Sequence, residues 1–408
     1  MNFGFFTILA AQFFSSLADN ALLFAAIALL AELSAPDWQT PVLQQFFVFS
    51  YIVLAPFVGP FADAIPKGRV MFVSNAVKFV GCIAMLVGLH PLYAYGIVGI
   101  GAAMYSPAKY GILTEYLPPE RLVWANGWME GLTVASIILG AIVGGVLIGP
   151  QAQQLAQGGV GLPGIDTAAR LALVVIVVLY VAAAIFNLYI PRVALDHKLP
   201  KKTLPFILHD FWHCFRLLWK DPLGQVSLAV TTLFWGAGAT LRLIILTWAA
   251  VALNFSLEKA TLLTAVVAVG IAVGSVLAAK FVHLERAVKV LPVGIAMGVV
   301  VMLMTLVTNF WVAAALLVTV GAMGGFFVVP MNALLQHRGH LLMGAGHSIA
   351  IQNFNENLSI LAMLGVYALM LKAELSIITI VLVFGIFVAA CMTVLWRKHG
   401  HDQDAGQT

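Results

Sequence analysis

Long apolar runs alternate along the chain with short segments rich in Pro, Gly and charged residues. A bilayer core of about 30 Å needs roughly 20 apolar residues per helix, and the pattern gives twelve runs of that size. The first run has no basic segment before it and no small-residue cleavage site after it, so we expect it to be retained as a span. The predicted spans are 5–33, 41–65, 69–89, 93–114, 123–149, 168–191, 223–253, 259–282, 289–308, 310–335, 346–371 and 375–396.

The longest polar stretch, 192–222, falls between the sixth and seventh runs and predicts that the chain is divided there into two halves. The halves resemble each other, since Gly101 and Pro107 recur as Gly324 and Pro330 at an offset of 223. Two similar six-helix halves are typical of secondary transporters, which bind substrate near the midplane. We therefore predict an all-α membrane protein of twelve transmembrane helices in two six-helix halves. The predicted parts are 1–191, a cytoplasmic linker at 192–222, 223–396, and a cytoplasmic tail at 397–408.

The linker itself contains an amphipathic segment. Its apolar residues follow helical spacing and its polar residues occupy the opposite face, which is typical of a helix lying on the membrane surface. His209, His213 and Cys214 could in principle bind zinc, but a third ligand is not evident and a polar interfacial face explains them. The apolar face is Leu208, Phe211, Trp212, Phe215, Leu218 and Trp219, and the polar face is His209, Asp210, His213, Arg216 and Lys220.

The positions of Lys and Arg predict the orientation, because cytoplasmic loops carry an excess of these residues. Fifteen bases fall on one side of the predicted bundle and three on the other, which places both termini in the cytoplasm. The fifteen are Lys67, Arg69, Arg121, Arg192, Lys198, Lys201, Lys202, Arg216, Lys220, Lys280, Arg286, Lys289, Arg338, Arg397 and Lys398. The three are Arg170, Lys259 and Lys372.

The composition supports a membrane protein and excludes some classes of function. The chain is 62% hydrophobic and only 9% charged, whereas an ordinary soluble chain carries about 25% charge. A formal net charge of +4 over 408 residues is not the footprint of a nucleic-acid-binding protein. Three cysteines without framework spacing suggest neither disulfides nor a metal site. We expect no cofactor.

Six charged residues lie inside predicted spans, where a charge costs about 2.5–3.5 kcal/mol and so needs a partner or a function. They are Asp19, Lys78, Lys109, Glu130, Arg242 and Glu356. The loop residues Arg69 and Met71 correspond to Lys289 and Leu291 at an offset of 220. The same offset maps Arg242 onto Leu22, one turn from Asp19, so Asp19 and Arg242 are candidates to meet or to share a ligand. A permanent ion pair that only docks the halves is the alternative.

The other intramembrane charges allow both structural and functional interpretations. Lys109 lies beside Pro107 and is either a phosphate anchor or a lysine that extends to the cytoplasmic boundary. Glu356 shares a helix face with Gln352 and Asn353, and this polar cluster is expected to line the interior. The sequence assigns no partners to Lys78 and Glu130, and local bridging explains them as well as ligand contact does.

The segment Gly59-Pro-Phe-Ala-Asp63-Ala-Ile-Pro-Lys67-Gly-Arg69 resembles the cytoplasmic-loop signature of the major facilitator superfamily, with a longer stretch after Asp63 than usual. The resemblance implies that Asp63 and Arg69 form a conformational latch. In it the Asp63 carboxylate lies at a neighbouring helix end, where the helix dipole favours an anion.

A more specific resemblance is to the bacterial lysophospholipid transporters of that superfamily. The resemblance rests on blocks of residues in five separate spans. These blocks are Ala18-Asp19-Asn20-Ala-Leu-Leu-Phe24, Tyr105-Ser-Pro-Ala-Lys109-Tyr-Gly-Ile-Leu113, Leu233-Phe-Trp-Gly-Ala237, Gly324-Gly-Phe-Phe-Val-Val-Pro330 and Gln352-Asn353 with Glu356-Asn357. The resemblance implies movement of lysophosphatidylethanolamine and lysophosphatidylglycerol from the outer to the inner leaflet of the bacterial inner membrane. There a separate cytoplasmic-side acyltransferase would re-acylate them, since this chain ends at Thr408.

Residue chemistry and resemblance together define the expected site. A lysophospholipid carries a phosphate, often an ammonium group, and one acyl chain, so its site needs a base, an acid and an apolar wall. We expect the substrate to contact Asp19, Asn20, Lys109, Arg242, Asn353 and Glu356. Lys78 and Glu130 are additional intramembrane charges that the site could include. The protein is expected to act as a monomer.

Two alternatives come from other classes of protein. A proton-coupled exporter of drugs or metabolites could use Asp19 or Glu356 as its proton carrier. An enzyme is not expected, because the His-x4-Asp spacing of an acyltransferase occurs only between His399 and Asp404 in the polar tail, and the chain has no nucleophile elbow, phosphate-binding loop or zinc spacing.

Overall fold

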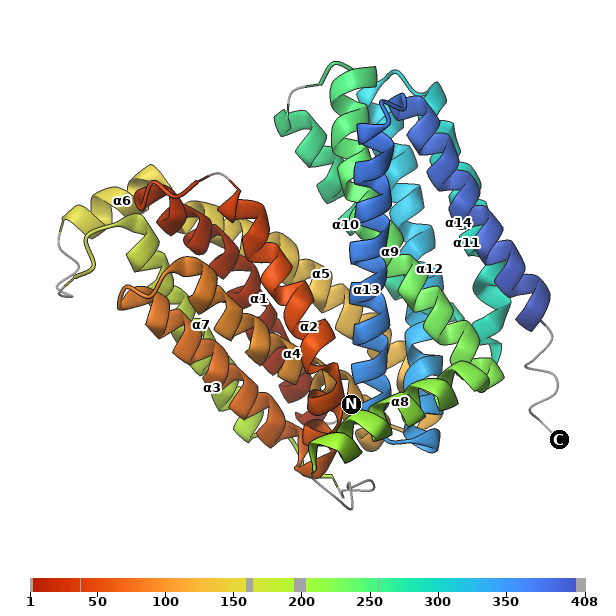
Figure 1. Cartoon of the computed structure of the whole chain (residues 1–408), viewed down its shortest axis with the longest axis horizontal. Coiled ribbons are helices and arrows are strands. Elements are labelled where there is room, and N and C mark those ends of the chain that lie inside the picture. The colour runs from red at the N-terminus through yellow and green to blue at the C-terminus, as the bar shows by residue number, and fades with distance from the viewer. Residues whose placement is uncertain (1–2, 37, 159–163, 194–202, 256, 401–408) are drawn as a thin grey trace. The chain divides into compact units, whose positions relative to one another are not determined.

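The computed structural model describes residues 3–36, 38–158, 164–193, 203–255 and 257–400, which form α-helices and short 3-10 helices without a strand (Figure 1). Lys198, Lys201, Lys202 and the tail residues 401–408, including Asp404, lie outside the described residues.

Twelve helical spans of the described chain correspond to the twelve predicted spans, so the predicted fold class is confirmed. By length and hydropathy eleven of them qualify as membrane spans, the ninth as the whole segment Leu284–Leu306 that contains α11, and α4 is the twelfth. It is 26 residues long, and Lys109 and several tyrosines lower its hydropathy. The twelve are α1 (Phe3–Glu32), α2 (Gln39–Ala64), α3 (Lys67–Leu86), α4 (Pro91–Tyr116), α5 (Leu122–Leu147), α7 (Ala168–Leu188), α9 (Pro222–Ala252), α10 (Leu257–Phe281), α11 (Leu291–Met302), α12 (Phe310–Leu342), α13 (Ala345–Lys372) and α14 (Ile377–His399).

Three elements differ from the predicted pattern. The short helix α6 (Pro150–Gln157) lies in a loop that the sequence left without structure. The ninth span is an α-helix only over α11, with 3-10 turns at Leu284–Val290 and Leu303–Leu306. Helix α12 continues seven residues past the predicted end at 335 and stops before Gly344, whose φ of 103° only glycine adopts without strain.

The linker helix is present as α8 (Leu204–Lys220). Phe211, Cys214 and Leu218 are buried along one side, whereas His209 and His213 are exposed. The amphipathic pattern therefore predicted the helix correctly, and its position on the membrane surface stays a prediction.

The chain forms two compact units that do not coincide with the two halves of the sequence. Unit 1 contains residues 1–116, 135–211 and 344–350, and unit 2 contains 117–134, 212–343 and 351–408. Helices α5 and α13 are each divided between the units, because the first part of each belongs with helices of the other half.

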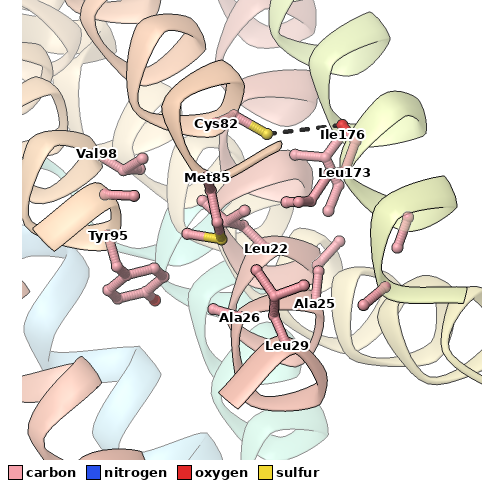
Figure 2. Close-up of a cluster of buried hydrophobic side chains, with 14 of the residues drawn as sticks. Leu22, Ala25, Ala26, Leu29, Cys82, Met85, Tyr95, Val98, Leu173 and Ile176 are labelled. Atoms are coloured by element: carbon pink, nitrogen blue, oxygen red, sulfur yellow. Dashed lines mark hydrogen bonds between the residues drawn. The ribbon is translucent and has the colours of Figure 1, made fainter. Parts of the chain in front are cut away.

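Unit 1 has an apolar core formed mainly by α1, α3, α4 and α7 (Figure 2). Leu22, Ala25 and Ala26 of α1 face Met85 of α3 and Leu173 of α7 in this core, and all five are buried. Small residues on α1 let the neighbouring helices approach closely, which is how packing stabilises helices inside a bilayer that supplies no hydrophobic driving force.

Unit 2 is organised around a close contact between α10 and α12. A Cβ atom added at Gly274 would collide with the backbone carbonyl oxygen of Ala322, and one at Gly270 would collide with the carbonyl oxygen of Val318. On α12, a Cβ atom added at Gly321 or Gly325 would likewise collide with a backbone carbonyl oxygen of α10. Glycine is needed at these positions because the two backbones touch.

Candidate functional site

A polar cavity of about 130 Å³ lies within unit 1, among α1, α2, α3 and α4. Gln12, Ser15, Ser16 and Asp19 reach it from α1 because residues three and four apart share a helix face. The remaining lining residues are Tyr51 of α2, Lys78 of α3, and Ala102, Tyr105, Ser106 and Lys109 of α4.

Buried Lys78 and partly buried Asp19 form an ion pair in this cavity. The Lys78 Nζ lies 2.6 Å from Asp19 Oδ2 and 3.0 Å from Ser15 Oγ, and 4.7 Å from the ring centroid of Tyr105. The Tyr180 hydroxyl donates to Asp19 Oδ1 over 2.8 Å. Sequence reasoning assigned no partner to Lys78, and the structure pairs it with one of the predicted site residues.

Lys109 lines the same cavity and is buried. Its Nζ lies 4.4 Å from the ring centroid of Tyr110, a favourable position for a cation. With Lys78 and Lys109 positive and Asp19 negative, the lining side chains carry one net positive charge. A partly desolvated cation of this kind binds phosphate oxygens more strongly than it would in water.

Asn20 does not line the cavity, although it follows Asp19 in the chain. Its side-chain amide donates to the Ser16 carbonyl over 2.8 Å, and its Cβ lies against Gly140 of α5. Its place in the structure is therefore a helix contact, and its role as a substrate contact stays a prediction.

Unit 2 contains a second buried polar cluster, which we call the glutamate network. Gln352 Nε2 donates to Glu356 Oε1 over 2.7 Å and to Asn332 Oδ1 over 2.9 Å. Asn332 Nδ2 in turn lies 3.4 Å from Glu130 Oε1. All four side chains are buried, so two carboxylates are connected through two amides. Glu130, which the sequence left without a partner, belongs to this network.

The network continues along α5 and α12 through a reciprocal amide pair. Asn126 and Gln336 each donate a side-chain hydrogen bond of 2.8 Å to the other. Both residues lie one helical turn from the network, at Glu130 and Asn332 respectively. This pairing explains why α12 continues through polar residues that the sequence pattern assigned to a loop.

Besides Asn20, two predicted substrate residues are not part of the two clusters. Asn353 is buried in α13 and its carbonyl accepts from Asn357 Nδ2 over 2.8 Å. Arg242 is exposed on α9 of unit 2, whereas Asp19 belongs to unit 1 and has Lys78 as its counter-ion. The expected meeting of Asp19 with Arg242 therefore stays a prediction.

Asp63, the predicted latch residue, lies at the N-terminal end of α13. Its Oδ1 accepts from the Gly346 N–H over 2.8 Å, and its Oδ2 accepts from the His347 N–H over 3.1 Å and lies 2.6 Å from His347 Nδ1. Backbone N–H groups at a helix start are a favourable anion site. A Cβ at Gly346 would lie only 2.5 Å from Asp63 Oδ1, so this contact requires glycine.

The base beside Asp63 is Lys67, and the part of Arg69 in the latch stays a prediction. Lys67 Nζ lies 2.7 Å from Asp63 Oδ1 and 3.0 Å from Glu115 Oε1, while Arg69 is exposed. The reason is geometrical, because Lys67 begins α3 and two further residues turn Arg69 to another face of that helix.

His347 was not among the predicted site residues, because 284 positions separate it from Asp63 and nothing in the sequence relates the two. Its Nε2 lies 3.2 Å from Asp210 Oδ2 of α8, and its Nδ1 contacts Asp63. The Nε2–Asp210 contact has an ion-pair distance but not the geometry of a hydrogen bond, so it is attractive only when the imidazole is protonated. His347 therefore connects the linker helix to the latch.

The helical fold corresponds to a class of membrane transporters. The Major Facilitator Superfamily pattern matches residues 8–363. Among solved structures, the transporter FucP in its outward conformation aligns with a TM-score of 0.76 at 13% identity, covering 97% of this chain and 98% of that one. A bacterial homologue of the iron transporter ferroportin aligns with a TM-score of 0.70 at 15% identity, covering 97% and 99%. At these identities the alignments show the fold alone.

Relatives of higher sequence identity identify the family within this superfamily. The lysophospholipid transporter LplT of Serratia proteamaculans (strain 568) is 45% identical over 390 residues, which is 95% of this chain and 94% of that protein. The protein of the same name from Yersinia pestis (strain Pestoides F) is 46% identical over 374 residues, covering 91% and 88%. The chain belongs to the major facilitator superfamily, in the family of the proteins named lysophospholipid transporter. This is a family of membrane transporters and not of enzymes.

Proposed function

We propose that this protein transports lysophospholipids across the bacterial inner membrane by alternating access. Its substrates are lysophosphatidylethanolamine and lysophosphatidylglycerol, which it moves from the outer to the inner leaflet. The polar cavity of unit 1 is the observation that carries the proposal. A buried cavity with one net positive charge suits a phosphate that must leave water, and relatives at 45–46% identity are named for this substrate class.

In this mechanism Lys109 binds the phosphate through charge-assisted hydrogen bonds. The Asp19–Lys78 pair keeps its own two charges compensated while the cavity is empty. When the head group enters, Lys78 can turn from Asp19 to the phosphate, and Asp19 is then available to an ammonium group. Phosphatidylethanolamine and phosphatidylglycerol derivatives share the phosphate, so this arrangement accepts both.

The cellular setting is part of the proposal. The product appears in the inner leaflet, where a separate acyltransferase restores the second acyl chain. Both termini are cytoplasmic, and the protein acts as a monomer. Alkaline phosphatase fused after Gly400 should be inactive in cells, since this enzyme needs an oxidising compartment to form its disulfides; an active fusion would contradict the orientation.

Uptake of radiolabelled lysophospholipids by spheroplasts tests the function. We expect Lys109→Met to reduce uptake of both substrates about tenfold or more, since a charge-assisted hydrogen bond contributes about 1.5–3 kcal/mol. Lys289→Met is the matched control, because Lys289 is exposed in a 3-10 turn. Equal uptake by the Lys109 variant and wild type would contradict the phosphate assignment.

A proton-coupled exporter is the second candidate, and the glutamate network favours it. Two buried carboxylates joined by amides are a suitable proton carrier. Transport into proteoliposomes with and without an imposed pH gradient separates the two functions. Lysophospholipid transport that ignores the gradient supports the first, and substrate accumulation that follows the gradient supports the second.

A further inference from the structure

Tyr105 lines the polar cavity of unit 1 without being one of its charged residues. It lies on α4, and its side chain is 4% exposed. Its hydroxyl is buried and has no hydrogen-bond partner within the described residues. Buried polar groups in folded proteins almost always have such a partner. The Tyr105 hydroxyl is therefore available to a molecule that enters the cavity.

Other hydroxyl groups around the cavity are already bonded within the protein. The Tyr51 hydroxyl donates to the Ala102 carbonyl over 3.0 Å. Ser15 Oγ donates to Asn75 Oδ1 over 2.8 Å and accepts from Lys78 Nζ over 3.0 Å. A tyrosine hydroxyl can both donate and accept a hydrogen bond, and Tyr105 retains this capacity. The cavity thus offers a ligand a neutral hydrogen-bonding group besides its charges.

Tyr105 adjoins both bases of the cavity. Lys109 is four residues further along α4, hence on the same face of the helix and about 6 Å along its axis. From α3, Lys78 Nζ lies 4.7 Å from the centroid of the Tyr105 ring. A phosphate held by Lys109, or by both lysines, is then next to the tyrosine. The Tyr105 hydroxyl can therefore meet the part of the substrate that adjoins the phosphate.

The part of a lysophospholipid that adjoins the phosphate is glycerol. It carries one free hydroxyl where a diacyl phospholipid carries a second ester. This hydroxyl donates and accepts, as a tyrosine hydroxyl does, whereas an ester has no proton to donate. The charged groups of the cavity suit the phosphate and the ammonium group, because hydrogen bonds between ionised partners are the stronger ones. The neutral Tyr105 hydroxyl suits the neutral hydroxyl of the substrate.

We propose that Tyr105 binds the free glycerol hydroxyl of the substrate and so distinguishes lysophospholipids from diacyl phospholipids. The inference rests on the proposed function, because it names a further contact of that substrate in the same cavity. It agrees with the binding of the phosphate by Lys109, one helical turn away. A site that bonds a substrate hydroxyl discriminates against an analogue without it, since the protein group then stays buried and unpaired.

A substrate analogue tests this contact. In deoxy-lysophosphatidylethanolamine, propane-1,3-diol replaces glycerol, so that only the free hydroxyl is missing. Uptake of the palmitoyl forms of both lipids is measured in proteoliposomes. In wild type we expect the analogue to have a KM about tenfold higher, because a hydrogen bond is lost and the Tyr105 hydroxyl stays unpaired. In Tyr105→Phe, which keeps the ring beside Lys78, we expect the two lipids to have equal KM values.

Tyr95→Phe is the matched control for transport. Tyr95 is also a buried tyrosine of α4, but it belongs to the apolar core of unit 1 and is not among the residues that line the cavity. We expect this variant to keep the wild-type ratio of KM values. A changed ratio in Tyr95→Phe would show that the discrimination does not depend on the cavity, and would count against the proposal.

Thermal unfolding gives a second measurement. Tyr105→Phe should not lower the unfolding midpoint, because the lost hydroxyl has no partner in the protein. Tyr51→Phe should lower it, because this variant loses the hydrogen bond to the Ala102 carbonyl. A midpoint lowered as much by Tyr105→Phe would show that the Tyr105 hydroxyl is bonded within the protein, and would overturn the proposal.

The transport outcomes separate this inference from the function on which it rests. If wild type transports neither lipid, the proposed function fails. If wild type transports both with equal KM values, the function stands and the binding of the free hydroxyl by Tyr105 is wrong. If Tyr105→Phe raises both KM values by the same factor, the tyrosine binds the phosphate rather than the glycerol, and the proposal is likewise wrong.

Discussion

Removing Asp19 and removing Lys78 should lower the free energy of unfolding by different amounts, because the two side chains differ in exposure. The Lys78 side chain is 1% exposed and that of Asp19 is 21% exposed. Removing one partner of a buried ion pair costs about 3–5 kcal/mol, because the remaining charge is uncompensated. Lys78→Met leaves a carboxylate that water reaches and that Tyr180 still stabilises with a hydrogen bond. Asp19→Asn leaves an ammonium group with almost no access to water.

We therefore expect Lys78→Met to lower the free energy of unfolding by about 3 kcal/mol and Asp19→Asn by about 5 kcal/mol, the two ends of that range. The double variant Asp19→Asn/Lys78→Met should lose less than the sum of the two, because it leaves no buried charge. Reversible unfolding of the purified protein in mixed micelles measures all three. Ser16→Ala is a control at the same cavity that changes no charge.

Two results would refute this reasoning. Losses that simply add in the double variant would show that the two charges do not compensate each other. A larger loss for Lys78→Met than for Asp19→Asn would show that exposure does not set the cost of the remaining charge. Uptake assays on the same variants then separate stability from transport, since the double variant should fold and still fail to bind substrate.

Two further predictions concern helix contacts. Gly274→Val should prevent stable folding, because its Cβ would collide with the Ala322 carbonyl, whereas Gly131→Val should be tolerated in the open space around Gly131. The yield of monodisperse protein in detergent measures the effect of both variants. Equal yields would contradict the packing argument. His347→Gln should lower stability by about 1–3 kcal/mol, because Asp63 loses a 2.6 Å contact while it stays buried. Asp210→Asn should cost less, since Asp210 is partly exposed; thermal unfolding midpoints compare the two, and a larger shift for Asp210→Asn would count against this account.

Much of the fold could be predicted from the sequence, because a bilayer imposes a simple rule. Every backbone polar group must be bonded internally, so each apolar run of sufficient length becomes a helix. The twelve predicted runs follow from that rule, and the linker helix follows from its amphipathic spacing. The rule ended α12 too early, at 335, because the polar side chain of Gln336 is paired with Asn126 of α5 in a tertiary contact.

The sequence alone determined which residues are unusual, namely the six charges within the spans, because a charge in hydrocarbon is costly wherever it lies. Only the tertiary structure decided their partners. Asp19 meets Lys78 across 59 positions, and Glu130 meets Asn332 across 202. Helical periodicity specifies which face of its own helix a side chain occupies. Which helix lies against that face depends on the packing of all the others, and for that reason the counter-ion of Asp19 could not be predicted from the order of residues.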